Sequence, residues 1–274
     1  MSPAPPSGSV GSLPISCVVI ARDAGDRIAA TLESAGGCAE RLVLDSGSTD
    51  ATVAIARACG ARVEHQPFLG FGLQKRRAVE LATHDWILSL DADEALDDEA
   101  ARGLASLDLS DPARCFAWRR RTFIGDREMR HGPWGHERVL RLFNRTRSGF
   151  TAHRVHERVD GATAPLPAPG SILHHSFLSC ADVIVRSARY AGPKAAILRD
   201  KGEASRAWML PLRGLAAFTK SYCLQGGWRD GAAGFIVALS RVVDSTLPRA
   251  IVSVDPPPAS PLPPADRPVA PPPR

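Results

Sequence analysis

Short apolar runs alternate with amphipathic stretches through the first hundred residues of the chain. The apolar runs have the length of buried strands, and the stretches between them repeat apolar residues at helical spacing. The pattern predicts strands at residues 15–21, 41–44, 61–64 and 86–90, and helices at residues 26–35, 49–59, 73–82 and 96–107. Strands that alternate with helices favour an α/β fold with a doubly wound, mostly parallel sheet.

The pattern changes beyond about residue 110. Short β-like segments lie among Gly, Pro and His, and three longer apolar stretches with helical spacing follow them. The segments are residues 115–124, 139–143 and 172–174, and the predicted helices are residues 181–201, 210–224 and 231–247, the last two forming an amphipathic hairpin. We therefore expect a disordered leader at residues 1–12, an α/β domain at residues 13–178, a helical C-terminal extension at residues 179–252 and a Pro-rich disordered tail at residues 253–274.

Composition and charge narrow the class of partner. The chain has 274 residues, 44% of them hydrophobic, and a formal net charge of +5. Its arginines cluster without forming a long basic tract, which favours anionic small molecules or an anionic membrane face over nucleic acid. The six cysteines form no CxxC pair, and no stretch has the pattern of a signal peptide or a spanning helix. These features predict a cytoplasmic protein.

Two carboxylates end the most apolar of the predicted strands. Residues 86–90 lead directly into Asp91-Ala92-Asp93, followed by further acidic residues. One interpretation is an acidic first turn of the next helix, which suits the helix dipole. The alternative is a site for a hard divalent cation that in turn holds a diphosphate. Because Asp91 precedes the predicted helix, we favour the cation site.

A second polar motif follows the predicted strand at residues 41–44. Asp45-Ser46-Gly47-Ser48-Thr49-Asp50 contains a glycine suited to a tight turn and several residues that can cap a helix. A capped strand-to-helix turn would explain it alone. The carboxyl ends of parallel strands also form ligand crevices, where Asp45 could bind a base or ribose.

Together the two motifs resemble those of the family 2 glycosyltransferases of GT-A fold. The resemblance is carried by residues 15–20, residues 42–50 and Asp91-Ala92-Asp93, and it extends to the basic segment at residues 72–76. Residues 137–143, 155–157 and 173–176 further resemble the branch that includes lipopolysaccharide core β-1,4-glucosyltransferases. The resemblance implies a GT-A-like domain and a metal-dependent hexosyltransferase.

The resemblance also implies roles for individual residues. Asp23 and Asp45 would lie near the nucleotide, Lys75 would belong to the basic segment of the donor site, and Asp91 and Asp93 would hold Mg²⁺ or Mn²⁺ and the diphosphate. Glu137 matches the position of the base that deprotonates the acceptor hydroxyl. Glu157 is the competing base.

Several charged residues and histidines carry interpretations of their own. Arg138 and Arg141 lie close to the proposed base Glu137 and are candidates for binding phosphate groups on the donor or the acceptor. His156 and His174 are candidates for completing the metal shell, although a histidine is more often a surface or satisfied core residue. The C-terminal hairpin either packs against the rest of the chain or rests on an anionic inner leaflet.

These expectations combine into one function with two alternatives. We expect an inverting transfer of a sugar, with glucose from UDP-glucose as the favoured donor, to a saccharide or lipid-linked acceptor in lipopolysaccharide core or other cell-envelope synthesis. The expected location is the cytoplasm, with peripheral contact at the cytoplasmic face of the inner membrane. A nucleotidyltransferase would need a Gly-rich basic loop after the first strand. At residues 21–26 this chain instead has an acidic segment that is poor in glycine. A non-catalytic nucleotide-sugar-binding module is the other alternative, because Ala24 and the residues around His136 depart from the family pattern.

Overall fold

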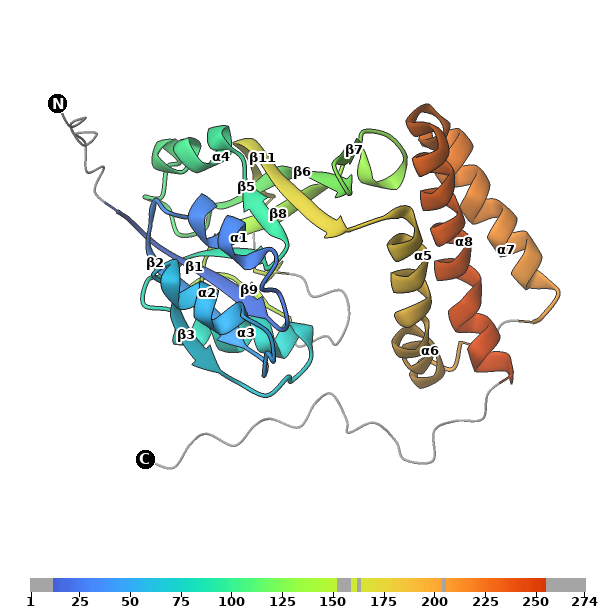
Figure 1. Cartoon of the computed structure of the whole chain (residues 1–274), viewed down its shortest axis with the longest axis horizontal. Coiled ribbons are helices and arrows are strands. Elements are labelled where there is room, and N and C mark those ends of the chain that lie inside the picture. The colour runs from blue at the N-terminus through green and yellow to red at the C-terminus, as the bar shows by residue number, and fades with distance from the viewer. Residues whose placement is uncertain (1–11, 152–158, 162–163, 204–205, 255–274) are drawn as a thin grey trace. The chain divides into compact units, whose positions relative to one another are not determined.

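A computed structural model of the chain describes residues 12–151, 159–161, 164–203 and 206–254 (Figure 1). The described chain forms two compact units. The first unit comprises the chain up to Trp118 together with Val139–Ile172, and the second comprises Arg119–Arg138 and the chain from Leu173 onward. The predicted domain bounds at residues 13–178 and 179–252 stay a prediction.

Four parallel strands form the centre of the first unit. They are β1 (Leu13–Ala21), β2 (Cys38–Asp45), β3 (Arg62–His65) and β4 (Trp86–Asp91), in the order β3-β2-β1-β4. The sheet continues through β8 (Arg138–Asn144), β6 (Cys115–Ile124), β11 (Leu166–Phe177) and β5 (Glu94–Leu96), and β7 (Arg127–Met129) pairs with β6. The strand β8 runs antiparallel to β4. A separate antiparallel pair joins β9 (Gly149–Phe150) to β10 (Val159–Asp160).

Helices cover both faces of the parallel strands because successive side chains of a strand point to opposite faces. Along β1, Cys17 and Val19 pack in a core with Ile28 and Leu32 of α1 (Ile28–Ser34). The intervening Val18 packs with side chains of α3 (Phe71–Leu81). The helix α2 (Thr52–Ala58) contributes Ala56 to the first of these cores. The predicted doubly wound, mostly parallel α/β fold is confirmed.

The prediction of one helix over residues 96–107 is wrong at both ends. The chain first forms the short strand β5, and the helix α4 spans only Asp98–Gly103 before a 3₁₀ turn at Leu104–Ser106. The Asp97 carboxylate accepts a hydrogen bond from Ala100 N at 2.9 Å, which fixes the start of α4. The apolar residues before Asp97 therefore belong to a strand.

Helices dominate the second unit. The predicted helix at residues 181–201 is wrong as a single helix, because α5 (Cys180–Arg189) and α6 (Ala191–Asp200) meet at Tyr190. Pro193 has no backbone N–H, and its ring conflicts with the carbonyl four residues earlier, so a continuous helix is disfavoured. The predicted hairpin forms from α7 (Met209–Phe218), which continues as a π-helical turn at Thr219–Leu224, and from α8 (Gly231–Val254).

The helix α8 lies between α5 and α7 and packs on both, as Figure 1 shows. It contributes Ala233 and Val237 to an apolar core with Val183 of α5 and with Ile124 and Met129. The helical C-terminal extension predicted from the sequence is thus confirmed. Among the described helices, none combines the length and the apolar character needed to cross a membrane.

A partly buried polar cluster at the amino end of the sheet leads to a pH prediction. Glu40 accepts hydrogen bonds from Ser16, Thr83 and Arg62. Burial opposes its ionisation, but these hydrogen bonds outweigh burial and lower the pKa of Glu40 from about 4.5 to about 2. A lowered folded-state pKa stabilises the protein above pH 4.5, and this contribution disappears as the pH falls toward 2.

We therefore expect Glu40→Gln to be less stable than the wild type at neutral pH and to approach it as the pH falls. Urea unfolding of both proteins at neutral pH and at about pH 3 measures the difference. A stability difference that stays constant between the two pH values would show that Glu40 is not a stabilising carboxylate.

Candidate active site

The carboxyl ends of β1, β2 and β4 meet at one edge of the sheet. Asp45, the last residue of β2, is paired in register with Ala21 at the end of β1. On the other side of β1, Asp91 at the end of β4 is paired with Ile20. The two predicted site carboxylates therefore flank one strand end, where ligands of open α/β sheets bind.

The loop after β2 is organised by Asp45. Its carboxylate accepts hydrogen bonds from Gly47 N at 2.9 Å, from Ser48 N at 3.1 Å and from the Ser48 hydroxyl at 2.5 Å. Gly47 has a φ of 91°, which a side chain would strain. Burial opposes ionisation of Asp45, but these hydrogen bonds outweigh it and hold the pKa of Asp45 below its usual value. The motif thus forms a preorganised anionic turn.

Asp23 ties the loop after β1 to the same turn. Its carboxylate accepts a hydrogen bond from Thr49 N at 2.8 Å, and its own N–H donates to the Ser48 hydroxyl at 2.9 Å. Asp23 has a φ of 49°, a left-handed conformation that Asp tolerates better than most residues. Ser48 and Thr49 therefore link two loops, while Asp50 accepts the hydrogen bond from Thr52 N at the start of α2. Nucleotide binding by Asp23 and Asp45 stays a prediction.

Two cations hold the Asp91 carboxylate. Lys75 Nζ of α3 lies 2.8 Å from Asp91 Oδ1, and Arg141 Nη2 of β8 donates to Asp91 Oδ2 at 2.7 Å. The Lys75 side chain is only 4% exposed, whereas that of Asp91 is 31% exposed. Asp91 therefore has a fixed orientation and an accessible carboxylate. The place of Lys75 in the donor site and phosphate binding by Arg141 stay predictions.

Glu94 completes this ionic cluster. It is fully buried and binds Arg141 in a bidentate pair, with Oε2 accepting from Nε at 2.7 Å and Oε1 from Nη2 at 2.6 Å. Its Oε2 also accepts a hydrogen bond from Asp91 N at 3.2 Å. The sequence interpretation treated Glu94 only as one of the acidic residues that follow Asp93, and it missed this role. The sequence signal for this role is the position of Glu94 directly before the apolar residues Ala95 and Leu96.

Asp93 lies in the turn between β4 and β5 and is partly exposed. The Thr31 hydroxyl of α1 donates to Ala92 O of this turn at 3.1 Å. Asp91 and Asp93 therefore present two carboxylates from one anchored turn. Carboxylate oxygens suit Mg²⁺ and Mn²⁺, and a carboxylate oxygen has two lone pairs, so it can bind a cation and accept a hydrogen bond together. The donor set fits the predicted cation when a diphosphate supplies further oxygens.

Histidine ligands for this cation stay predictions. His174 belongs to the second unit, where its ring nitrogens lie 3.3 Å from the Thr122 hydroxyl and 2.8 Å from the Ser176 hydroxyl. His156 lies outside the described residues. Within the part of the chain that the structure describes, no group of three or more His, Cys, Asp and Glu side chains is placed to bind a metal ion. His65, which sequence reasoning missed, lies 3.6 Å from Asp45 Oδ2.

The predicted base Glu137 lies in the second unit. Its carboxylate pairs with Arg120 Nη2 at 2.7 Å, and its backbone carbonyl accepts from Arg120 N at 2.8 Å. The neighbouring Arg138 is exposed. The competing base Glu157 lies outside the described residues. The choice between Glu137 and Glu157 stays open.

The buried ionic cluster leads to a stability prediction. Replacing Arg141 by Met should lower the free energy of unfolding by about 3 kcal/mol or more, because it leaves the buried Glu94 carboxylate without its guanidinium. The matched control is Arg138→Met, an exposed position on the same strand, which should change stability by less than about 0.5 kcal/mol. Urea unfolding measures both. Adding Glu94→Gln to Arg141→Met should recover part of the loss, and a double variant less stable than Arg141→Met would contradict the account.

Comparison with known proteins identifies the family. The model of glycosyl transferase family 2 matches residues 16–164, which include both motifs and the ionic cluster. The chain belongs to this family. The resemblance to family 2 glycosyltransferases that the sequence motifs indicated and the GT-A-like fold class are both confirmed.

Two relatives match across most of their length. The chain is 29% identical over 243 residues to the lipopolysaccharide core biosynthesis glycosyltransferase LpsC of Rhizobium meliloti, covering 85% of this chain and 90% of LpsC. It is 27% identical over 237 residues to an uncharacterized glycosyltransferase of Rickettsia conorii, covering 81% and 83% of the two chains.

Among solved structures, the chain is similar to glucosyl-3-phosphoglycerate synthase from Mycobacterium tuberculosis in complex with Mn²⁺, UDP and glucosyl-3-phosphoglycerate. The identity is 26% and the TM-score 0.31, and the match covers 40% of this chain and 43% of the synthase.

Proposed function

We propose that the chain is an inverting, metal-dependent hexosyltransferase that transfers glucose from UDP-glucose to a saccharide or lipid-linked acceptor. The observation that carries the proposal is the pair Asp45 and Asp91 on either side of the β1 end, in a chain of glycosyl transferase family 2. The match to LpsC supports an acceptor in lipopolysaccharide core or another cell-envelope glycan. We propose a cytoplasmic location, which agrees with the scattered cysteines.

In this proposal the residues around β1 bind the donor. Asp23 and Asp45, fixed by the loops after β1 and β2, accept hydrogen bonds from the nucleoside. Asp91 and Asp93 hold Mg²⁺ or Mn²⁺ against the diphosphate, and when bound the cation stabilises the charge that develops on the leaving diphosphate. Lys75 and Arg141 keep Asp91 oriented toward the donor and add positive charge beside the phosphates.

The acceptor hydroxyl must lose a proton as it attacks the anomeric carbon. We assign this proton transfer to Glu137, whose carboxylate is oriented by Arg120. Attack on the face opposite the leaving group inverts the anomeric configuration. The bond from the anomeric carbon to the diphosphate breaks while the new glycosidic bond forms, and the displaced product is UDP.

A panel of nucleotide sugars tests this proposal with the full chain, Mn²⁺ and deacylated lipopolysaccharide core oligosaccharide. We expect UDP-glucose to be consumed in preference to the other donors, with a product that is β-linked by NMR. Preference for a different donor would contradict the glucose assignment. Binding of UDP without turnover of any donor would favour the non-catalytic binding module, for which the departures at Ala24 and near His136 are the argument.

A further inference from the structure

An exposed apolar stripe follows one face of α7. Trp208, immediately before the helix, is 63% exposed, Leu212 is 57% exposed and Leu215 is 64% exposed. Their spacing of i, i+4 and i+7 places the three side chains on one face of the helix. The exposure continues beyond α7 at Leu224 and Trp228, which are 79% and 58% exposed. Large apolar groups concentrated in this way mark an interaction surface.

The same segment is basic and carries little exposed negative charge. Arg213 of α7 and Lys220 of the π-helical turn that follows it are both exposed. Residues 206–240 hold four Lys and Arg against the single acid Asp230, which is buried and pairs with His131 at 2.8 Å. Across residues 179–254 there are eleven Lys and Arg and five Asp and Glu, although the whole chain has a net charge of only +5.

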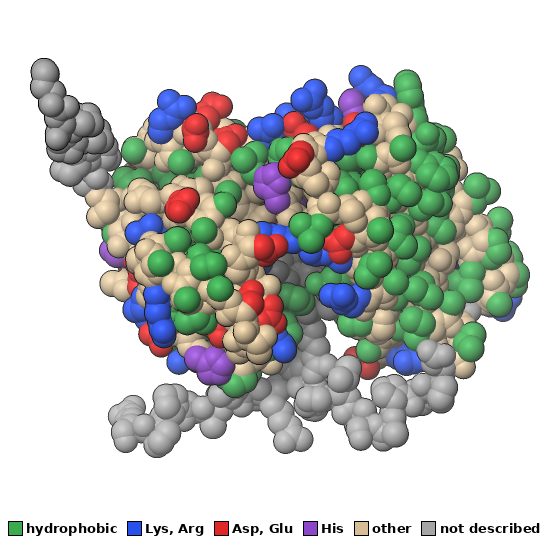
Figure 2. Space-filling model, viewed as in Figure 1, with side chains coloured by type: hydrophobic (Ala, Val, Ile, Leu, Met, Phe, Trp, Pro, Cys, Tyr) green, Lys and Arg blue, Asp and Glu red, His purple; other side chains and the backbone are tan. Residues whose placement is uncertain are grey.

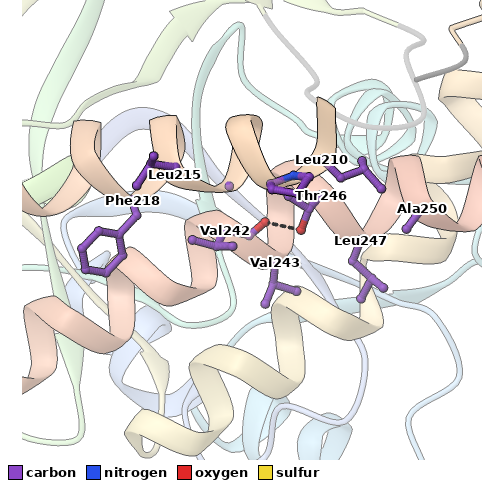
Figure 3. A pocket seen from close by; sticks show the side chains of 10 residues that line it. Leu210, Leu215, Phe218, Val242, Val243, Thr246, Leu247 and Ala250 are labelled. Carbon is purple, nitrogen blue, oxygen red and sulfur yellow. Dashed lines mark hydrogen bonds between the residues drawn. The ribbon is translucent and has the colours of Figure 1, made fainter. Parts of the chain in front are cut away.

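An apolar groove lies between α7 and α8, next to the stripe (Figure 3). It has a volume of about 640 Å³, and its walls include Leu210, Leu215, Phe218 and Leu247. Its polar lining side chain, Thr246, donates its hydroxyl to Val242 O at 2.7 Å. The groove therefore suits hydrocarbon and offers little to a sugar. Figure 2, viewed as in Figure 1, shows hydrophobic side chains gathered over the region of α7 and α8.

We propose that the α7 surface, defined by Trp208, Leu212, Leu215, Arg213 and Lys220, docks on an anionic phospholipid bilayer. Trp and Leu side chains enter the boundary between headgroups and acyl chains, while the cations bind the anionic headgroups. A second copy of the chain fits less well. A symmetric contact of this surface with itself would bring the cations of both copies together.

Flotation of the full chain with vesicles tests the proposal. The vesicles contain either phosphatidylcholine alone or equal parts of phosphatidylcholine and phosphatidylglycerol. We expect binding to the anionic vesicles that added salt weakens, and little binding to the neutral ones. Arg213→Glu with Lys220→Glu should weaken binding by about twentyfold or more, and Trp208→Ser with Leu212→Ser should also weaken it.

The matched charge control is Arg57→Glu with Arg102→Glu, which changes the same number of charges on α2 and α4 and should leave vesicle binding unchanged. Vesicle binding requires no sugar transfer, so the flotation experiment can succeed or fail independently of the proposed function. Circular dichroism and urea unfolding establish that each variant is folded.

Equal binding of the wild type and the α7 variants would overturn the proposal, as would equal losses in the control. A protein that ignores vesicles but forms a dimer in light scattering, which Trp208→Ser with Leu212→Ser dissociates, would also overturn it and assign the surface to a second copy.

Discussion

Replacing Asp93 by Asn is expected to lower the rate of sugar transfer by about a thousandfold. The amide cannot supply the negative charge that holds a divalent cation against the donor diphosphate. The carboxylate of Asp91 is left intact in this test, because its replacement would remove the ion pairs with Lys75 and Arg141. Initial rates at increasing Mn²⁺ concentration measure the effect, and the variant should also need more Mn²⁺.

Asp98→Asn is the matched control for Asp93→Asn. Asp98 is exposed in the first turn of α4, so its replacement removes the same charge a few residues away. We expect its transfer rate to stay close to that of the wild type. Equal losses in the two variants would mean that the transfer rate depends on the total negative charge near the turn. Asp93 would then have no specific role in binding the cation.

Replacing Glu137 by Gln is expected to lower kcat by about a hundredfold to ten thousandfold, the usual contribution of a general base. Gln keeps the shape of the side chain and can still accept a hydrogen bond from Arg120. The pH profile gives the decisive evidence, because the acidic limb of kcat/KM that reports the base should disappear in the variant. A purely structural role for Glu137 would leave this limb in place.

Glu128→Gln provides a control of similar chemistry in the same unit. Glu128 pairs with Arg121 at 2.9 Å, next to the Arg120 that pairs with Glu137. The control should keep both its rate and its pH profile. If Glu157→Gln abolishes transfer while Glu137→Gln retains it, the base is Glu157 and the assignment of Glu137 is wrong.

The parallel part of the fold is predictable from sequence because its strands are buried on both faces. Val18 and Val19 pack into different cores, so β1 has to be apolar at consecutive positions. The errors arise where local chemistry overrides periodicity. The cap at Asp97 shortens the helix expected at residues 96–107, and Pro193 divides the one expected at residues 181–201.

Part of the candidate site depends only on residues that are neighbours in the sequence, and that part can be predicted from the sequence. Asp45 and Asp91 directly end apolar strands, and parallel pairing with β1 brings their strand ends to one edge. The ionic cluster depends on contacts far apart in the chain. Arg141 reaches Asp91 because β8 pairs antiparallel with β4, with Leu142 opposite Leu88. Sequence spacing contains no information on that register, so the partnership of Arg141 with Glu94 emerged only from the structure.

The most direct test of the central claim is turnover of UDP-glucose without acceptor, measured as released UDP with and without Mn²⁺. Our account predicts slow release that requires Mn²⁺ and is lost in Asp93→Asn. Binding of UDP-glucose that is independent of metal, without release of UDP and unchanged in Asp93→Asn, would contradict it.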